Sequence, residues 1–347
     1  MSRPGGRRVL ALALPLLLAG CSGIQSALDP RGPQADAIAT LAWVLFIGAA
    51  LIFVAVMAMA VAGFIWPDQL SRVNPRRFMV GGGVVFTSSV LVVLTVYSTW
   101  VGSRVSDASD VNIIGAGTRI QPDEDRLVIE AVGYMWWWEF RYLGTPHGDV
   151  VLANEVHIPV GRPVEFRLKA ADVIHSFWIP SLHGKRDMIP GHNNLIVMQA
   201  EKPGLLRGQC AEFCGDQHTL MSFFVMAHEP EEFEDWLAAQ ARPAREPDTP
   251  ELQRGAEVFL EQGCGACHVV RGLSDGPLQA VGQLGPDLTH VGSRLSLGAG
   301  AMPNGVGPLG GWIANAQGIK PGNRMPNFDR LPSEDLTAVA RYLESLK

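Results

Sequence analysis

Two long apolar stretches, 38–66 and 78–101, stand out in the hydrophobic pattern of the chain. Each exceeds the ~20 residues that cross the hydrocarbon core of a bilayer, and neither contains a charged residue. A hairpin buried inside a soluble domain is the alternative, which the absence of charge disfavours. We therefore predict a transmembrane hairpin over 35–104. The basic loop at 67–77 predicts a cytoplasmic turn, so that both ends of the hairpin face outward.

A shorter apolar run, 9–18, precedes the hairpin and follows a basic start. The run is too short to cross a bilayer. Its flanking residues are typical of an export signal, so we predict a cleaved signal peptide over 1–20. The segment 18–21, Leu-Ala-Gly-Cys, is also similar to a bacterial lipoprotein cleavage box, which would make Cys21 the lipidated N-terminus. Ordinary cleavage nearby, with no role for Cys21, is the alternative.

Short β-rich runs broken by Gly, Pro and Asn begin near residue 127. Their spacing and composition predict a β-sandwich or barrel. An acidic helix over 231–241 is expected to close this all-β domain, which we place at 105–240. The clearest runs are 127–132, 155–158, 164–168, 195–199 and 222–227.

The C-terminal part follows a linker rich in Pro and charge, 241–250. A helix is expected from Thr249, as its cap, to about residue 262. A last helix is expected with Ser333 as its cap, because acidic residues and then a regular apolar face follow that position. These features predict an all-α domain over 251–347.

Charge and composition narrow the classes of function. Charged residues make up 18% of the chain, which favours membrane association over a purely soluble enzyme. Acidic residues outnumber basic ones over 107–245, which argues against nucleic acid as a ligand and suits a basic protein partner. A solvated acidic face without a partner is the other interpretation. The chain has 5 cysteines, an odd number that does not fit a simple disulfide framework.

A dense group of soft metal donors lies in the β region, and an earlier imidazole, His175, could join it from a neighbouring strand. Zinc would use both thiols and two histidines but leave the methionine unexplained. A disulfide would explain none of the histidines, and a blue-copper centre would need only one thiol. Two copper ions bridged by both thiols would use every donor. The donors in the segment 210–221 are Cys210, Cys214, His218 and Met221.

This segment resembles the dinuclear copper A motif of the cytochrome c oxidase subunit II family, and 175–180 also matches that family. The family's fold is a cupredoxin-like β-barrel preceded by two transmembrane helices. The resemblance also implies that the Glu212 carboxylate reaches a magnesium ion at the boundary with subunit I. The implied copper ligands are Cys210 and Cys214 as bridges, His175 and Met221 on one copper, and His218 and the backbone carbonyl of Glu212 on the other.

An aromatic run, 134–142, resembles the family's aromatic segment, in which the first tryptophan is where electrons enter. Trp136 is the matching position. Core packing within a strand is the alternative for Trp137 and Trp138, because successive residues of a strand face opposite sides. The run departs from the usual family pattern at Tyr134, Met135 and Trp137.

Histidines outside these motifs are not assigned to metal. His183 and His192 fall in loops marked by Gly and Pro, where exposed histidines are ordinary. The others are expected to be structural: His147, His157, His228 and His290.

The C-terminal domain carries the pattern C-x-x-C-H in Cys264, Cys267 and His268. This is the signature of covalent c-type haem attachment, in which the thiols take up the vinyl groups and the histidine lies beneath the iron. A thioredoxin-like pair is the alternative, but the βαβ setting that it needs is not visible. The segment 322–328 resembles the ligand loop of class I cytochromes c, so Met325 is expected as the sixth ligand in preference to Met302. His/Met ligation suits an electron carrier.

Together the two parts resemble caa3-type haem-copper oxidases, with subunit II over 35–240 and a fused cytochrome c over 251–347. The resemblance implies a proton-pumping cytochrome c oxidase of the bacterial inner membrane, with both cofactor domains on the periplasmic face. Electrons would pass from cytochrome c or a membrane donor to haem c, to copper A and then to haem a and the oxygen-reducing centre in subunit I.

Subunit III and other subunits would complete this complex, and the chain alone would not reduce oxygen. The alternatives are a subunit that feeds electrons to a nitric oxide reductase, a membrane-tethered periplasmic electron carrier and a copper-delivery protein. Nitrous oxide reductase, which also holds such a copper pair, fits worse because it lacks the membrane hairpin.

Overall fold

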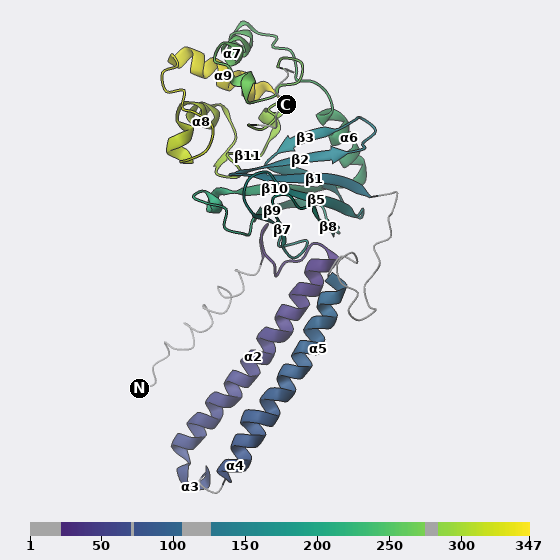
Figure 1. The fold of residues 1–347 in the computed structure, drawn as a ribbon, viewed down its shortest axis with the longest axis vertical. Coiled ribbons are helices and arrows are strands. Elements are labelled where there is room, and N and C mark those ends of the chain that lie inside the picture. Colours follow the sequence, from purple (N-terminus) through teal and green to yellow (C-terminus); the bar gives the residue numbers. More distant parts are fainter. Residues whose placement is uncertain (1–21, 71–72, 106–125, 275–283) are drawn as a thin grey trace, which may run out of the picture.

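The computed structural model describes residues 22–70, 73–105, 126–274 and 284–347. A helical hairpin, a β-sandwich and a helical unit follow one another along the chain, and the helical unit lies on the side of the sandwich away from the hairpin (Figure 1). The predicted signal peptide and Cys21 lie outside the described residues.

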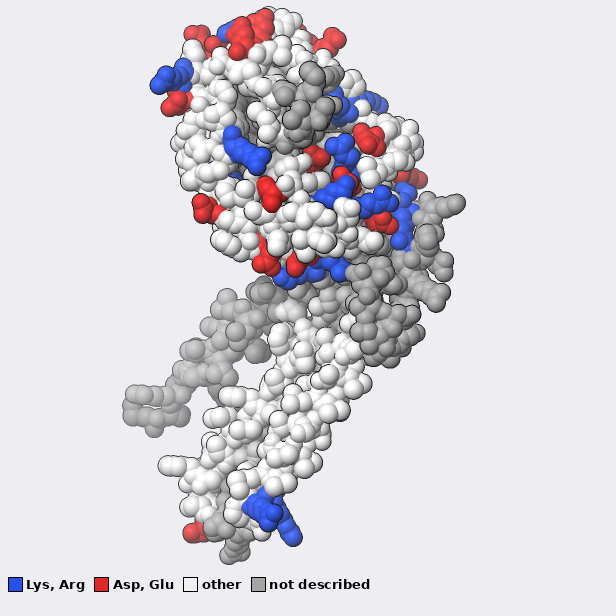
Figure 2. Space-filling view, in the orientation of Figure 1, with Lys and Arg blue, Asp and Glu red and all other residues white. Residues whose placement is uncertain are grey.

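Two long neighbouring helical stretches form the hairpin. Helix α2 spans Pro33–Ile65, and the short helix α3 spans Pro67–Leu70. The chain returns through α4 (Pro75–Phe78), the π-helix η1 (Met79–Phe86) and α5 (Thr87–Val105). Both stretches are long and apolar enough to cross a membrane, and their large apolar side chains are mostly exposed. On the face drawn in Figure 2 the described part of the hairpin is free of charge except at its far end, which carries basic residues and one acidic residue. The expected hairpin is therefore present.

Two five-stranded sheets pack face to face to form the sandwich. Their strand orders are β3-β2-β1-β5-β8 and β4-β10-β9-β6-β7. Side chains from both sheets fill one core, whose fully buried members include Trp138, Phe166 and Phe223. Helix α6 (Pro230–Gln240) covers one end, as expected. The strands are β1 Leu127–Tyr134, β2 Trp137–Leu143, β3 Val150–Ala153, β4 Glu155–Pro159, β5 Val164–Ala170, β6 His175–Trp178, β7 Arg186–Met188, β8 Asn194–Met198, β9 Gly204–Cys210 and β10 Ser222–His228.

The helical unit has a second, separate core. Its first helix begins as expected, because the Thr249 hydroxyl accepts a hydrogen bond from the Leu252 backbone N–H at 3.3 Å. The last helix begins at Ser333 itself, with Pro332 as the N-cap, so the expected cap at Ser333 is wrong. The proline ring fixes φ and holds Pro332 in extended backbone, which places Ser333 inside the first turn. The main helices are α7 Pro250–Glu261, α8 Val306–Ile319 and α9 Ser333–Ser345.

Hydrogen bonds tie the helical unit to the sandwich. Ser222, the first residue of β10, donates to the Ala299 carbonyl through its backbone N–H at 3.1 Å and its hydroxyl at 3.0 Å. The Glu155 carboxylate accepts from the Leu295 backbone N–H at 2.9 Å. These contacts fix one orientation of the two units.

Helices α7 and α9 touch at Gly255. A Cβ atom at this position would meet the Ala338 carbonyl oxygen and lie 2.6 Å from the Cβ of Tyr342. The crossing therefore requires a residue without a side chain.

We expect Gly255→Ala to destabilise the helical unit by about 1–3 kcal/mol, because the added methyl group overpacks the crossing. Gly311→Ala is the matched control, because a Cβ on this exposed face of α8 would meet nothing within 4 Å. It should stabilise the unit by roughly 0.5–1 kcal/mol. Thermal unfolding followed by circular dichroism compares the two, and equal melting temperatures would contradict this account of the crossing.

Candidate functional site

The loop between β9 and β10 carries most of the predicted copper ligands. Cys210 is the last residue of β9, and Met221 directly precedes β10. The backbone N–H of Cys210 donates to the Met221 carbonyl at 2.9 Å, so the ladder of the two strands closes the loop at its base. A 3₁₀ turn, η2 (His218–Leu220), folds the loop back toward the cysteines.

Six donor atoms converge at this loop. The two sulfurs of Cys210 and Cys214 lie 3.7 Å apart, and both cysteines are free and buried. His175 reaches the site from the start of β6, as the sequence predicted. The remaining approaches are His175 Nδ1 to Cys210 Sγ at 3.8 Å, the Glu212 carbonyl oxygen to Cys210 Sγ at 3.2 Å, His218 Nδ1 to Cys214 Sγ at 3.6 Å and Met221 Sδ to Cys214 Sγ at 3.7 Å.

These spacings fit metal coordination and exclude a disulfide in this structure. A disulfide would bring the sulfurs to about 2.05 Å. Two ligands at roughly 2.3 Å from one ion, at a tetrahedral angle, lie about 3.7 Å apart, which is the separation of the two sulfurs. Six donors exceed the four of a structural zinc site, and the thioether and thiols are soft ligands that suit copper. The residues present therefore fit a pair of copper ions.

The two thiols titrate as a coupled pair. The contact between the two thiol groups lowers the pKa of Cys210. The same contact, together with burial, raises the pKa of Cys214. A metal ion that binds both sulfurs displaces the protons that they carry.

Asp172 is a residue of this site that the sequence analysis missed. Its carboxylate lies 2.9 Å from His175 Nε2 and accepts the Met135 backbone N–H at 2.7 Å. Burial opposes ionisation, but hydrogen bonds from His175, Met135 and Val173 hold the pKa of Asp172 below its ordinary value. Burial likewise would lower the pKa of His175, and Asp172 and Cys210 raise it instead. Asp172 orients the ring so that Nδ1 faces the cysteines.

Trp136 lies directly behind the copper loop. Its indole N–H donates to the Cys214 carbonyl at 2.8 Å, and its side chain is only 8% exposed. The same ring lies near Gly322 of the helical unit, where an added Cβ would be 3.5 Å from it. Trp138 is fully buried in the sandwich core, as the alternative interpretation of the aromatic run predicted, while Trp137 stacks on Tyr134 with ring centroids 4.4 Å apart.

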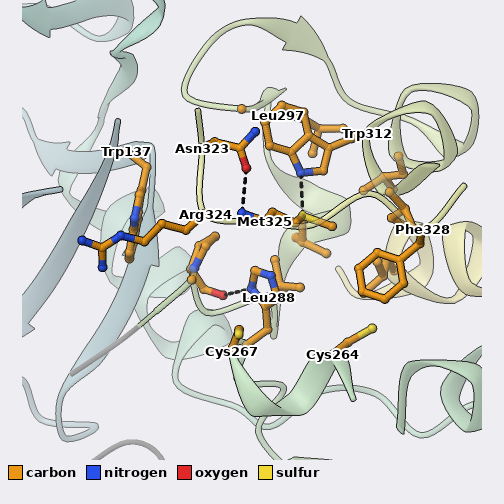
Figure 3. A pocket seen from close by; sticks show the side chains of 18 of the residues that line it. Trp137, Cys264, Cys267, Leu288, Leu297, Trp312, Asn323, Arg324, Met325 and Phe328 are labelled. Carbon is orange, nitrogen blue, oxygen red and sulfur yellow. Dashed lines mark hydrogen bonds between the residues drawn. The ribbon is translucent and has the colours of Figure 1, made fainter. Parts of the chain in front are cut away.

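A cavity of about 400 Å³ occupies the helical unit where it meets the sandwich (Figure 3). Cys264 and Cys267 lie on one side of it and Met325 faces it from the other. His268 Nδ1 lies 2.8 Å from the Pro286 carbonyl. This bond fixes the tautomer that leaves Nε2 free, and burial lowers the pKa of His268, which keeps the ring neutral. A neutral imidazole is what a haem iron requires.

Met302 lies away from the cavity, whereas two hydrogen bonds hold Met325 beside it. The Met325 sulfur accepts the Trp312 indole N–H at 3.1 Å, and its backbone N–H donates to the Asn323 side chain at 2.7 Å. Within the described part of the chain, Met302 does not line the cavity. It lies in the short strand β12 (Met302–Pro303) and packs, partly buried, against the core of the helical unit. The cavity and its donors thus fit haem c.

Tryptophan and methionine side chains of the sandwich also line this cavity. Met135, Trp136 and Trp137 contribute to its wall beside Lys320. The positions at which the aromatic run departs from the family pattern therefore include two, Met135 and Trp137, that border the cavity. Burial lowers the pKa of Lys320, and the nearby Cys214 offsets only part of this effect, so the pKa falls to about 7.

Two further predictions concern the sandwich surface. His183 was expected to be exposed but is only 6% exposed, so that expectation is wrong, while His192 is exposed as expected. The His183 loop, which follows β6, packs on the start of α2: the Ala35 backbone N–H donates to the Leu182 carbonyl at 3.1 Å.

The Glu212 carboxylate, predicted to reach magnesium, is partly exposed and lies 3.8 Å from the Lys185 ammonium.

We expect Asp172→Asn to weaken copper binding by roughly 10–100-fold, because a neutral amide replaces the charged carboxylate that accepts the hydrogen bond from His175 and orients its ring. Asp149→Asn, at an exposed position of the same domain, should leave the affinity unchanged. Competition between the full chain and a copper chelator measures both. An affinity of Asp172→Asn equal to that of the unchanged chain would contradict the orienting role.

We expect Met325→Leu to abolish the charge-transfer absorption of methionine-ligated oxidised haem and to lower the haem reduction potential, because the sulfur ligand is lost. Met302→Leu, the matched control, should change neither. Visible spectra and redox titration of the two variants test the assignment. The reverse pattern would identify Met302 as the ligand.

Comparison with known proteins agrees with this geometry. The family profile described as cytochrome c oxidase subunit II, periplasmic domain, matches residues 145–228, and the profile described as cytochrome c matches residues 252–347. Cytochrome c oxidase subunit 2 of Alkalihalophilus pseudofirmus is 33% identical over 346 residues, covering 96% of this chain and 95% of that protein. Its counterpart in Bacillus subtilis is 29% identical over 358 residues, covering 98% of each.

The solved structures similar to this chain include the crystal structure of the periplasmic domain of cytochrome oxidase subunit II from Bradyrhizobium japonicum. It is 31% identical and covers 33% of this chain and 92% of that one, with a TM-score of 0.31. The relative from Alkalihalophilus matches the membrane, copper and cytochrome parts in one alignment. The chain belongs to the cytochrome c oxidase subunit II family, in the form that carries a cytochrome c domain after the copper domain.

Proposed function

We propose that this chain is subunit II of a proton-pumping haem-copper cytochrome c oxidase. It takes electrons from cytochrome c or a membrane donor and, by means of haem c and dinuclear copper A, delivers them to haem a and the oxygen-reducing centre of subunit I. Family membership makes the chain an electron-transfer component of an oxidoreductase complex. The route and the coupling to proton pumping are the proposed part.

The copper A ligands are proposed residue by residue. Each copper is proposed to have four donors: the two bridging sulfurs and two further groups, one beside each sulfur. His175 lies next to Cys210 and Met221 next to Cys214 in one set, while the Glu212 carbonyl and His218 take those places in the other. For haem c, Cys264 and Cys267 form the thioethers, and His268 and Met325 are the axial ligands.

When bound, the two groups accept and release single electrons. The protein's own donors would fill every position on both coppers and both axial positions of the haem iron, so neither site would retain a place for oxygen, unlike a catalytic metal site. The chain alone is therefore expected not to reduce oxygen. The surrounding residues hold the donors rigidly and exclude water: both thiols and His175 are buried.

Trp136 carries the proposal that the two sites work together. Its indole N–H binds the carbonyl of the ligand Cys214, and its ring lines the haem cavity. We propose Trp136 as the residue through which electrons reach copper A from the haem domain of the same chain. Because the donor is tethered, its effective concentration is high and steering by surface charge matters less.

Family membership and the two apolar helices indicate a membrane-anchored protein with periplasmic domains. We propose a bacterial inner-membrane location, a signal peptide over 1–20, lipidation at Cys21 and domain limits of 35–104, 105–240 and 251–347 around the linker 241–250. Subunit I, subunit III and further oxidase subunits are the proposed partners. The Glu212 carboxylate is the proposed magnesium ligand at the boundary with subunit I.

We expect Cys214→Ser to stop oxygen consumption by the purified oxidase while haem c is still reduced by the donor, because removing a bridging thiolate dismantles the copper site. Haem c should then stay reduced in the presence of oxygen. Thr219→Ala, an exposed change in the same loop, should behave like the unchanged oxidase. Stopped-flow spectra with oxygen uptake provide the measurement. Oxygen uptake at the normal rate by a copper-free Cys214→Ser oxidase would overturn the proposed route.

A further inference from the structure

Lys320 is a buried ionisable side chain between the two cofactor domains. It directly follows α8 and is only 3% exposed. Lysine is almost never fully buried without a partner. Within the described part of the chain no carboxylate lies within ion-pair distance of it, so its charge is met in another way.

Three backbone carbonyls from three different segments accept hydrogen bonds from the Lys320 ammonium. They belong to Trp136 at 2.7 Å, Leu220 at 2.7 Å and Gly298 at 2.9 Å. An ammonium group has three protons, so all of its donors are used. Two of the acceptors lie in the sandwich and one in the helical unit, and the lysine therefore joins both domains.

The segments that meet at Lys320 are those that hold the two cofactors. Leu220 directly precedes the ligand Met221, and Trp136 binds the carbonyl of Cys214. On the haem side, the Asn323 side chain donates to the Lys320 carbonyl at 2.6 Å and accepts the Met325 backbone N–H at 2.7 Å. A continuous set of hydrogen bonds thus runs from the haem ligand loop to the copper loop.

A second bond supports the same junction. The Gln217 side chain, one residue before the ligand His218, donates to the Pro321 carbonyl at 2.9 Å. Gly322 lies beside the Trp136 ring, because a Cβ at this position would be at an ordinary contact distance of 3.5 Å from the ring. The haem ligand loop is thereby seated directly on Trp136 and the copper loop.

We propose that Lys320 is a positioning residue that fixes the haem ligand loop against Trp136 and the copper loop, and so sets the gap that electrons cross within this chain. The proposal rests on the proposed function, because it assumes transfer between haem c and copper A. When protonated, Lys320 also places a positive charge near Cys214, which stabilises the more negative, reduced copper site. Removing that charge should therefore lower the copper reduction potential.

The test uses the complete oxidase with Lys320→Met, which keeps an unbranched side chain only one atom shorter but has no donor or charge. One electron is placed on haem c by a light-activated reductant, and its arrival at copper is followed by absorption. We expect unchanged haem and copper spectra, internal transfer slower by roughly tenfold or more because small misplacements have large effects on rate, and a lower copper potential. Lys202→Met, at an exposed turn of the copper domain, should match the unchanged oxidase.

Lys320→Arg separates position from charge and provides the test if Lys320→Met does not assemble. Its planar fork cannot direct three N–H groups at the same carbonyls, so transfer should slow while the copper potential stays near its normal value. Transfer within twofold of the normal rate in either assembled variant would overturn the role of Lys320. An unchanged oxidase in which the electron never reaches copper would contradict the proposed function instead.

Discussion

The arrangement of both cofactor sites depends on how the copper loop is closed. A single backbone hydrogen bond from Cys210 to Met221, continuous with the β9–β10 ladder, joins the ends of the loop. The two strands are part of a sheet with a fully buried core face, so the loop ends cannot separate without breaking that sheet. The closure holds the sulfurs of Cys210 and Cys214 3.7 Å apart, close enough to share ions and too far apart to be a disulfide.

The closed loop also provides the surface on which the helical unit is seated. The Cys214 carbonyl fixes the Trp136 indole, and the Leu220 carbonyl accepts a proton of Lys320. The haem ligand loop then follows through Asn323 to Met325. A copper loop built for rigid coordination thus positions the tethered electron donor as well, and one hydrogen-bonded set of residues links the two sites.

The local motifs could be predicted from the sequence because their donors are close in the chain. The segment 210–221 and the C-x-x-C-H pattern each define a site within a few residues, and the two long apolar stretches define the hairpin. Asp172 and Lys320 could not be found in this way. Asp172 lies three residues before His175, but no motif marks it, and the Met135 backbone N–H that it also accepts is distant in sequence. Lys320 binds the carbonyls of Trp136 and Gly298, which only the packed domains bring near it.

The burial of one histidine and the first residue of one helix also could not be predicted from the sequence. His183 has the sequence setting of an exposed loop residue, but its loop packs on the start of α2 and the ring is buried. The cap of α9 was misplaced by one residue because both Pro332 and Ser333 suit a helix start. The ligand sets for copper and haem remain predictions, which the donor geometry supports.

The central claim is that this loop holds two copper ions that share one unpaired electron, and an electron paramagnetic resonance spectrum of the oxidised oxidase, together with its metal content, tests it most directly. The account predicts two copper ions per copy of this chain and hyperfine splitting from two equivalent copper nuclei. A single copper with splitting from one nucleus, or a silent site filled with zinc, would contradict it.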